Sequence, residues 1–146
     1  MDLNATMKYL PLILTALIMS VLSTSDLKAQ TTVSEENNYV ILTRKIAQLQ
    51  PILLAAQELK KEDGDMFGQY HVIICGQEIG GITEPDKVDK FIAMSKKAGV
   101  QLVACGFSLN KFDVDRDLVP KDIIIVENGL LYNLQLQKKG YYSLGL

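Results

Sequence analysis

Four short apolar runs, each followed by a segment of helical periodicity, constrain the fold of this chain more than any other feature. The first run reads YVILT, and the others are similarly rich in valine, isoleucine and leucine. Runs that are apolar on consecutive residues are typical of strands buried on both faces of a parallel sheet. The predicted strands cover residues 39–43, 70–75, 100–105 and 122–126, and a short final strand covers 141–144.

The segments between these strands have apolar residues at helical spacing. A first helix is predicted over 46–59, and a second begins at Pro85, with Thr83 as its candidate N-cap. A short helix over 106–112 follows the third strand directly, and a last helix covers 130–139. Because strands and helices alternate, the sequence predicts an α/β fold, a single domain with a parallel sheet of about five strands and helices on both faces.

Length and charge narrow the number of domains and the classes of partner. The 146 residues are 48% hydrophobic and 22% charged, which is the composition of one ordinary globular domain. The chain has 15 basic and 17 acidic residues, a formal net charge of -2, and the two signs are interspersed. Nucleic acid is therefore not an expected partner, because no basic stripe is available to follow a phosphate backbone.

The N-terminus has the three parts of a secretory signal. Lys8 precedes the apolar run LPLILTALIMSVL at 10–22, and small polar residues follow at 23–25. The run is shorter than the ~20 residues that cross a bilayer as a helix, and Ala29 ends a suitable cleavage site. The sequence therefore predicts a signal peptide at 1–29.

Cleavage near Ala29 defines the expected organisation of the rest of the chain. Residues 30–38 form a polar linker, and residues 39–146 form the α/β domain. We expect the mature protein to be periplasmic or secreted and to have no stable membrane span, because no later apolar run approaches spanning length. The alternative is an uncleaved anchor, since Leu27 is larger than the small residue preferred at that position.

Both cysteines end predicted strands, and Cys105 is the better candidate for a reactive group. Parallel sheets place ligands and reactive groups at the carboxyl ends of their strands, where Cys75 and Cys105 both lie. Gly106 and a predicted helix follow Cys105 at once, so free N–H groups and the helix dipole would stabilise a thiolate and lower the thiol pKa. The alternative is an inert cysteine that ends a buried strand.

The segment after the second strand is rich in glycine and contributes further candidate site residues. Gly76, Gly80 and Gly81 could cradle an anion near the cysteines, and Glu78 could serve as an acid or base. These glycines match neither the dinucleotide fingerprint nor the P-loop, so no cofactor is expected. No metal is expected either, because two cysteines and one histidine are too few ligands for a structural zinc site.

Three segments carry a resemblance to a known family. Residues 99–109 have the sequence GVQLVACGFSL, residues 129–131 are GLL, and residues 134–141 are LQLQKKGY. In order and spacing they resemble the DsrE/DsrF-like sulfur-relay family over residues 39–144. The resemblance implies that Cys105 accepts sulfane sulfur as a persulfide and passes it to a partner. It also implies a homo-oligomer, a trimer or hexamer, while the sulfur donor and acceptor stay unknown.

The two cysteines leave a second chemistry open. An oxidising compartment favours disulfides, and two cysteines are the smallest number that can pair within a chain. If the second and third strands are neighbours, their ends lie about 5 Å apart and a Cys75–Cys105 bridge is feasible, whereas an intervening strand would forbid it. Three functions are therefore considered: a sulfur carrier or sulfurtransferase-like protein that uses Cys105, a thiol-redox protein that uses both cysteines, and a non-catalytic oligomeric binding module.

Overall fold

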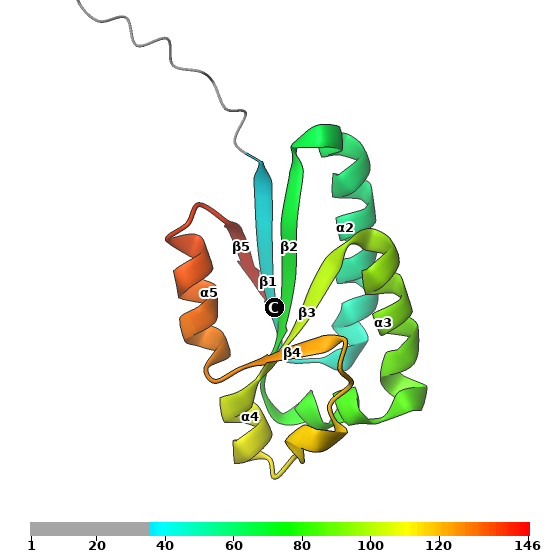
Figure 1. Cartoon of the computed structure of the whole chain (residues 1–146), viewed down its shortest axis with the longest axis vertical. Coiled ribbons are helices and arrows are strands. Elements are labelled where there is room, and N and C mark those ends of the chain that lie inside the picture. The colour runs from blue at the N-terminus through cyan, green and yellow to red at the C-terminus, as the bar shows by residue number, and fades with distance from the viewer. Residues whose placement is uncertain (1–35) are drawn as a thin grey trace, which may run out of the picture. The chain divides into compact units, whose positions relative to one another are not determined.

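The computed structural model describes residues 36–146, which form a five-stranded sheet in the order β4-β3-β2-β1-β5 (Figure 1). Every pair of neighbouring strands is parallel, which confirms the predicted fold class. The predicted signal peptide, its cleavage site and most of the predicted linker lie outside the described residues. The strands are β1 (Asn37–Thr43), β2 (Phe67–Ile74), β3 (Val100–Cys105), β4 (Ile123–Val126) and β5 (Tyr142–Gly145).

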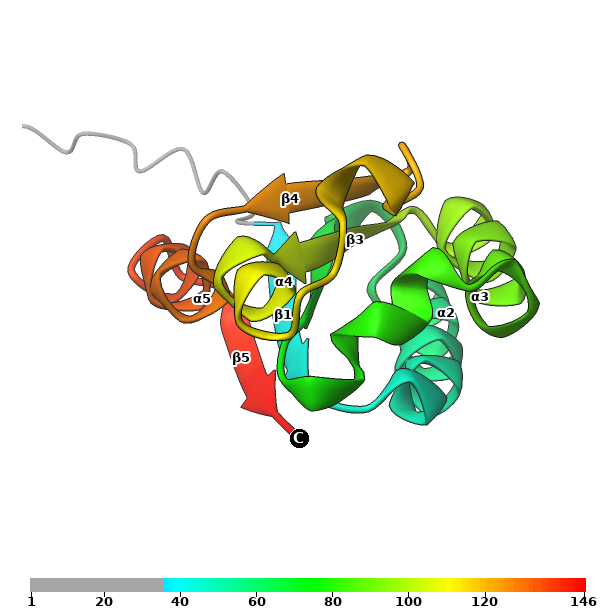
Figure 2. The ribbon, with the colours of Figure 1, turned by 90° about the horizontal axis from the view of Figure 1, so that it is seen from below.

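Helices cover both faces of the sheet, as Figure 2 shows from the carboxyl ends of the strands. On one face, α2 (Leu49–Asp63) packs against α3 (Pro85–Ala98), and α5 (Gly129–Gln137) covers the other face. The short helix α4 (Gly106–Lys111) follows β3 directly and lies at the carboxyl end of the sheet. Short 3₁₀ helices complete the connections: η1 (Ile46–Gln48), η2 (Gly64–Met66), η3 (Gln77–Thr83) and η4 (Arg116–Leu118).

The central strands are apolar on consecutive residues because helices cover both of their faces. Val40, Val72 and Val103 lie on three neighbouring strands, and all three are fully buried. At the edge of the sheet, β4 has one neighbour only, and Ile124 in it is partly exposed. The buried central strands thus fix the positions of the chain segments that follow β1, β2 and β3.

The sheet begins earlier than the sequence predicts. β1 starts at Asn37, so two residues assigned to the polar linker belong to the first strand. Asn37 pairs with Phe67 across the ladder, and its side-chain amide donates to the carboxylate of Asp63 at 3.0 Å. Asparagine is poor in strands by propensity, and here side-chain hydrogen bonds hold it in place.

The sequence predicts a loop between β2 and α3. In the structure most of this connection forms the 3₁₀ helix η3. Thr83 is not the N-cap of α3: its hydroxyl donates to the carbonyl of Gly80 at 2.8 Å, inside η3. Glu84 takes the N-cap position without a side-chain cap bond, and Pro85 is the first residue of α3, as predicted.

Candidate functional site

A cavity of about 610 Å³ opens at the carboxyl ends of β1, β2 and β3. Parallel sheets place ligands at the carboxyl ends of their strands, and Figure 2 views the sheet from that end. Cys75 and Cys105, the two thiols predicted as site residues, both line the cavity. Its wall also includes residues of α4, of the connection after β1, and of the start of α5.

The two cysteines lie side by side because β2 and β3 are neighbours. The ladder pairs Ile74 with Ala104, so Cys75 and Cys105 follow at the same level of the sheet. Both cysteines are buried and both are free thiols. The strand order, which the sequence left open, is therefore the one that allows the two sulfur atoms to meet.

Gly129, the first residue of α5, approaches both cysteines closely. Its N–H donates to the Sγ of Cys105 at 3.2 Å. A Cβ at this position would lie 2.8 Å from the Sγ of Cys75 and 3.0 Å from the Cβ of Cys105, so a residue larger than glycine would displace the helix. The side chain of Asn128 accepts the N–H groups of the two residues after Gly129, which fixes the start of α5.

Ser108 provides further hydrogen bonds to the same sulfur. It lies in the first turn of α4 and is buried. Its hydroxyl accepts the N–H of Gly76 at 2.9 Å, and hydrogen bonding from its hydroxyl and its backbone N–H acts to lower the pKa of Cys105. Ser108 thus links the end of β2 to the thiol that ends β3.

These contacts move the pKa values of the two thiols in opposite directions. Burial alone would raise the pKa of Cys105, but the hydrogen bonds from Gly129, Ser108 and Cys75 outweigh it and hold the pKa below the ordinary value. Burial raises the pKa of Cys75 to about 12, and the charge on Cys105 and the hydrogen bond to it add to this. Cys105 is therefore the more acidic thiol of the pair, and its pKa shifts in the direction that the sequence predicts.

Only part of the predicted glycine-rich segment reaches the cavity. Gly76 lies on the cavity wall with a φ of 81°, a conformation that favours glycine. Gly80 and Gly81 line a separate, smaller hollow instead. A Cβ on Gly81 would lie 2.9 Å from the Cγ1 of Ile46, so this glycine allows close packing of η3 against η1. Neither of these two glycines lies beside Cys105.

Glu78, predicted as a candidate acid or base, has a structural contact in the folded chain. Its carboxylate accepts the N–H of Ile46 at 3.1 Å, although the residue also lines the cavity. This bond satisfies a free N–H at the start of η1, in the way that side-chain caps do. Glu78 therefore ties the connection after β1 to η3.

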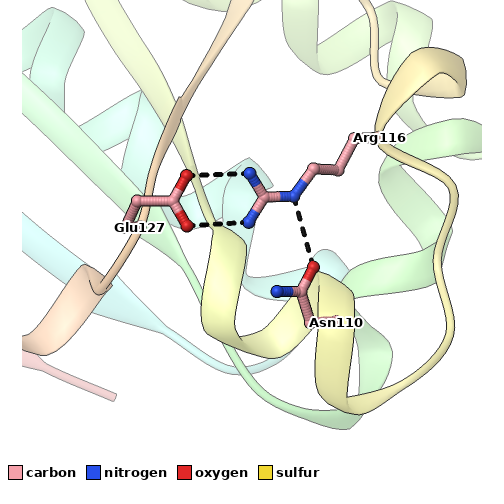
Figure 3. A network of polar contacts seen from close by, with 3 residues as sticks. All are labelled: Asn110, Arg116 and Glu127. Atoms are coloured by element: carbon pink, nitrogen blue, oxygen red, sulfur yellow. Dashed lines mark hydrogen bonds and ion pairs between the residues drawn. The ribbon is translucent and has the colours of Figure 1, made fainter.

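A polar network holds the loop before α5 (Figure 3). Arg116 donates to both carboxylate oxygens of Glu127 at 2.8 and 2.9 Å, and its Nε donates to Asn110 at 3.2 Å. The guanidinium lies over Gly106, a predicted site residue, where a Cβ would be 2.6 Å from Nη2. The network thus fixes the chain two residues before Gly129, whose N–H contacts the Cys105 sulfur.

The described part of the chain has neither a metal-binding cluster nor a membrane-spanning helix. Within residues 36–146, no group of three His, Cys, Asp or Glu side chains could hold a metal ion. No helix in the same residues is long and apolar enough to cross a membrane. The sole histidine, His71, lies in β2 and contacts the hydroxyl of Tyr132 at 3.1 Å.

Sequence reasoning missed Ser108, Asn128 and Gly129. Ser108 lies in the helix that follows Cys105, and its position three residues after the cysteine does not by itself indicate a contact with the sulfur. The pair Asn128-Gly129 does carry one, because asparagine after an apolar strand is a helix N-cap signal. That signal would have placed N–H donors at the carboxyl end of the sheet, although not next to a particular sulfur.

The fold and this edge define a class: small parallel α/β proteins with a cavity at the carboxyl ends of the strands, here lined by two cysteines. No family model matches the sequence, and no curated protein matches it. Among solved structures it is similar to MTH1491 from Methanobacterium thermoautotrophicum, a protein of unknown function, with 13% identity and a TM-score of 0.59 over 77% of this chain and 100% of that one.

A second similar structure is that of BT1422 from Bacteroides thetaiotaomicron, a conserved protein of unknown function. It has 16% identity and a TM-score of 0.59, over 75% of this chain and 95% of that one. At these identities the similarity shows a shared fold.

Proposed function

We propose that the chain is exported and acts as a sulfur carrier or sulfurtransferase-like protein, with Cys105 as the persulfide acceptor. The observation that carries this proposal is the N–H of Gly129, which donates to the Cys105 sulfur at 3.2 Å on the wall of an open cavity. Hydrogen bonds of this kind favour the thiolate, which is the nucleophilic form of cysteine. The resemblance of residues 99–109 to the sulfur-relay family supports the same role.

The proposed transfer needs one nucleophile and one leaving group. The Cys105 thiolate attacks the outer sulfur of the donor, and a bond forms between Sγ and that sulfur. The donor's own bond to the outer sulfur breaks, and its electron pair leaves with the remainder of the donor. An acceptor nucleophile then takes the terminal sulfur of the persulfide, and Cys105 returns to the thiolate.

A thiol-redox function is the second candidate, and the adjacency of β2 and β3 favours it. Neighbouring strands place their Cα atoms about 5 Å apart, within the range of a disulfide. In this reaction Cys75 and Cys105 lose two protons and two electrons to an oxidising disulfide, and a bond forms between their Sγ atoms. The same two thiols would then form and break a bridge without carrying sulfur.

Intact mass spectrometry of the purified chain separates these functions. We expect a sulfane-sulfur donor to add one sulfur atom, which a dithiol removes and which maps to the peptide of Cys105. A loss of two hydrogens on treatment with an oxidising disulfide, without sulfur gain, would favour the redox function instead. If neither reagent changes the mass, both proposals are wrong and the non-catalytic binding module is the better description.

We further propose that the protein is a homo-oligomer, a trimer or hexamer, as the resemblance implies. The outer face of α5 supports this, because Leu130, Leu131 and Leu134 are each more than half exposed, and contiguous exposed apolar side chains mark interaction surfaces. Sedimentation should give three or six times the mass of one chain. Leu131→Glu with Leu134→Glu should dissociate it, and a monomeric wild-type protein would contradict the proposal.

A further inference from the structure

Three cations line the cavity beside the cysteines. Arg44 and Lys45 follow β1, and Lys111 ends α4. In the part of the chain that the structure describes, none of the three pairs with a carboxylate. Glu78 is the one acidic side chain on the described lining, and it accepts the N–H of Ile46. The cavity therefore has an excess of positive charge that is available to an anion.

The side chain of Arg44 lies close to the thiol pair. Its Cβ and Cγ are 3.4 Å from the position that a Cβ would take on Gly76, the residue after Cys75. The charge of Arg44 also acts to lower the pKa of Cys75, against the larger effect of burial. An anion bound by Arg44 in this cavity would therefore share it with the two cysteines.

Another part of the wall is apolar. It is formed by Phe107 in α4, Phe112 after it, and Leu130 in α5, with exposed fractions of 65%, 39% and 59%. An exposed apolar wall beside a few polar groups is typical of small-molecule sites, whose volumes are about 300–1,000 Å³. The cavity of about 610 Å³ falls within that range and has room for an organic body.

We propose that the sulfur donor is a small organic anion of the thiosulfonate class, which joins an apolar body to a negatively charged sulfonyl and sulfane-sulfur group. Arg44 and Lys111 would bind the charged group, and Phe107 and its apolar neighbours would contact the body. The inference rests on the proposed persulfide function of Cys105 and adds the class of donor. It follows from the combination of unpaired cations, exposed aromatic side chains and a thiolate around one cavity.

The transfer is balanced in atoms and charge. The Cys105 thiolate attacks the sulfane sulfur, a sulfur–sulfur bond forms, and the bond between the sulfane and sulfonyl sulfurs breaks. The electron pair leaves with the sulfonyl group as a sulfinate anion, so two negative charges enter and two leave. A thiolate and an anionic donor repel each other, and nearby cations offset this repulsion while stabilising the leaving sulfinate.

The charge requirement is tested with benzenethiosulfonate as the donor and intact mass as the readout. The double variant Arg44→Gln/Lys111→Gln should form persulfide about tenfold more slowly than the wild type. Lys97→Gln/Lys121→Gln removes the same charge from exposed positions outside the cavity and should load at the wild-type rate. To separate anion binding from a general change in thiol reactivity, alkylation of the double variant by neutral iodoacetamide and by anionic iodoacetate is also measured. The iodoacetate rate should fall severalfold more than the iodoacetamide rate.

The apolar requirement is tested with Phe107→Ala. This substitution should slow loading from benzenethiosulfonate but leave loading from thiosulfate, which has no apolar body, within about twofold of the wild-type rate. Equal slowing with both donors would mean that Phe107 supports the cavity and not the donor, and would overturn this part of the inference.

The remaining outcomes separate this inference from the proposed function. If inorganic polysulfide loads Cys105 but benzenethiosulfonate does not, the donor class is wrong and the persulfide function stands. The donor class is also wrong if the Arg44→Gln/Lys111→Gln variant loads from benzenethiosulfonate as fast as the wild type. If no donor loads Cys105, the proposed function itself fails, and the inference fails with it.

Discussion

Replacing Cys105 with serine is expected to abolish both persulfide formation and alkylation of the chain at neutral pH. Serine has no thiolate, and the neighbouring Cys75 cannot substitute for it, because burial raises the pKa of that thiol to about 12. The effect should be all-or-none in intact mass, with circular dichroism as the control for folding. A Cys105→Ser variant that still gains sulfur would show that another residue is the acceptor.

The pH dependence of alkylation tests the environment of the thiolate. Only the thiolate reacts, and the pKa of Cys105 is lowered, so its iodoacetamide rate should level off at a lower pH than the ordinary cysteine value of about 8.5. Cys75→Ala removes a hydrogen-bond donor to the thiolate, so the profile should move to higher pH and the rate at pH 7 should fall about threefold to tenfold.

Cys75→Ser is the matched control for that shift. Its hydroxyl can still donate a hydrogen bond to Cys105, so its pH profile should stay near that of the wild type, whereas Cys75→Ala should not. If both variants shift the profile equally, the size of the side chain matters and the hydrogen bond does not. A wild-type profile with an ordinary midpoint would contradict the assignment of Cys105 as the thiolate.

Gly129→Ala is expected to have the largest effect of any single methyl group added near the site. The new Cβ would lie 2.8 Å from the Sγ of Cys75, 2.9 Å from the Cγ2 of Ile73 and 3.0 Å from the Cβ of Cys105. These neighbours lie in two central strands or directly after one of them, so α5 must move, at a cost of about 1–3 kcal/mol in the free energy of unfolding. The displaced N–H would also release the sulfur and raise the pKa of Cys105.

Urea unfolding and the pH profile of alkylation measure the two effects of Gly129→Ala separately. Gly145→Ala is the control, because nothing lies within 4 Å of a Cβ at that position and its φ is not positive. We expect its stability to change by less than about 0.5 kcal/mol. If Gly129→Ala is as stable as the wild type and keeps the same pH profile, the close approach of α5 does not support the thiolate.

The fold could be predicted from the sequence because strands that are buried on both faces have apolar residues at consecutive positions. The third strand was predicted with the bounds that the structure shows, Val100–Cys105. The first strand was predicted too short, since Asn37 and Asn38 carry no hydropathy signal and are held by hydrogen bonds to distant residues. Strand order could not be predicted, because it depends on pairings between segments far apart in the chain.

The candidate site was predictable only where one residue carries the signal. Cys75 and Cys105 were found because each ends an apolar run, and such ends meet at one edge of a parallel sheet. Gly129 lies 24 residues from the sulfur that it contacts, and no local pattern connects them. The hydrogen bond of Glu78 could not be predicted for the same reason, since its partner Ile46 is 32 residues away.

Helix α5 joins the cavity that holds the two cysteines to an exposed face of leucine side chains. Its first N–H contacts the Cys105 sulfur, and the next two residues, Leu130 and Leu131, are more than half exposed. A chain that covers these leucines would therefore touch the same helical turn that supports the thiolate. Assembly would then be coupled to thiol reactivity. Any tilt of α5 at an interface would change the hydrogen bond between the N–H of Gly129 and the Cys105 sulfur.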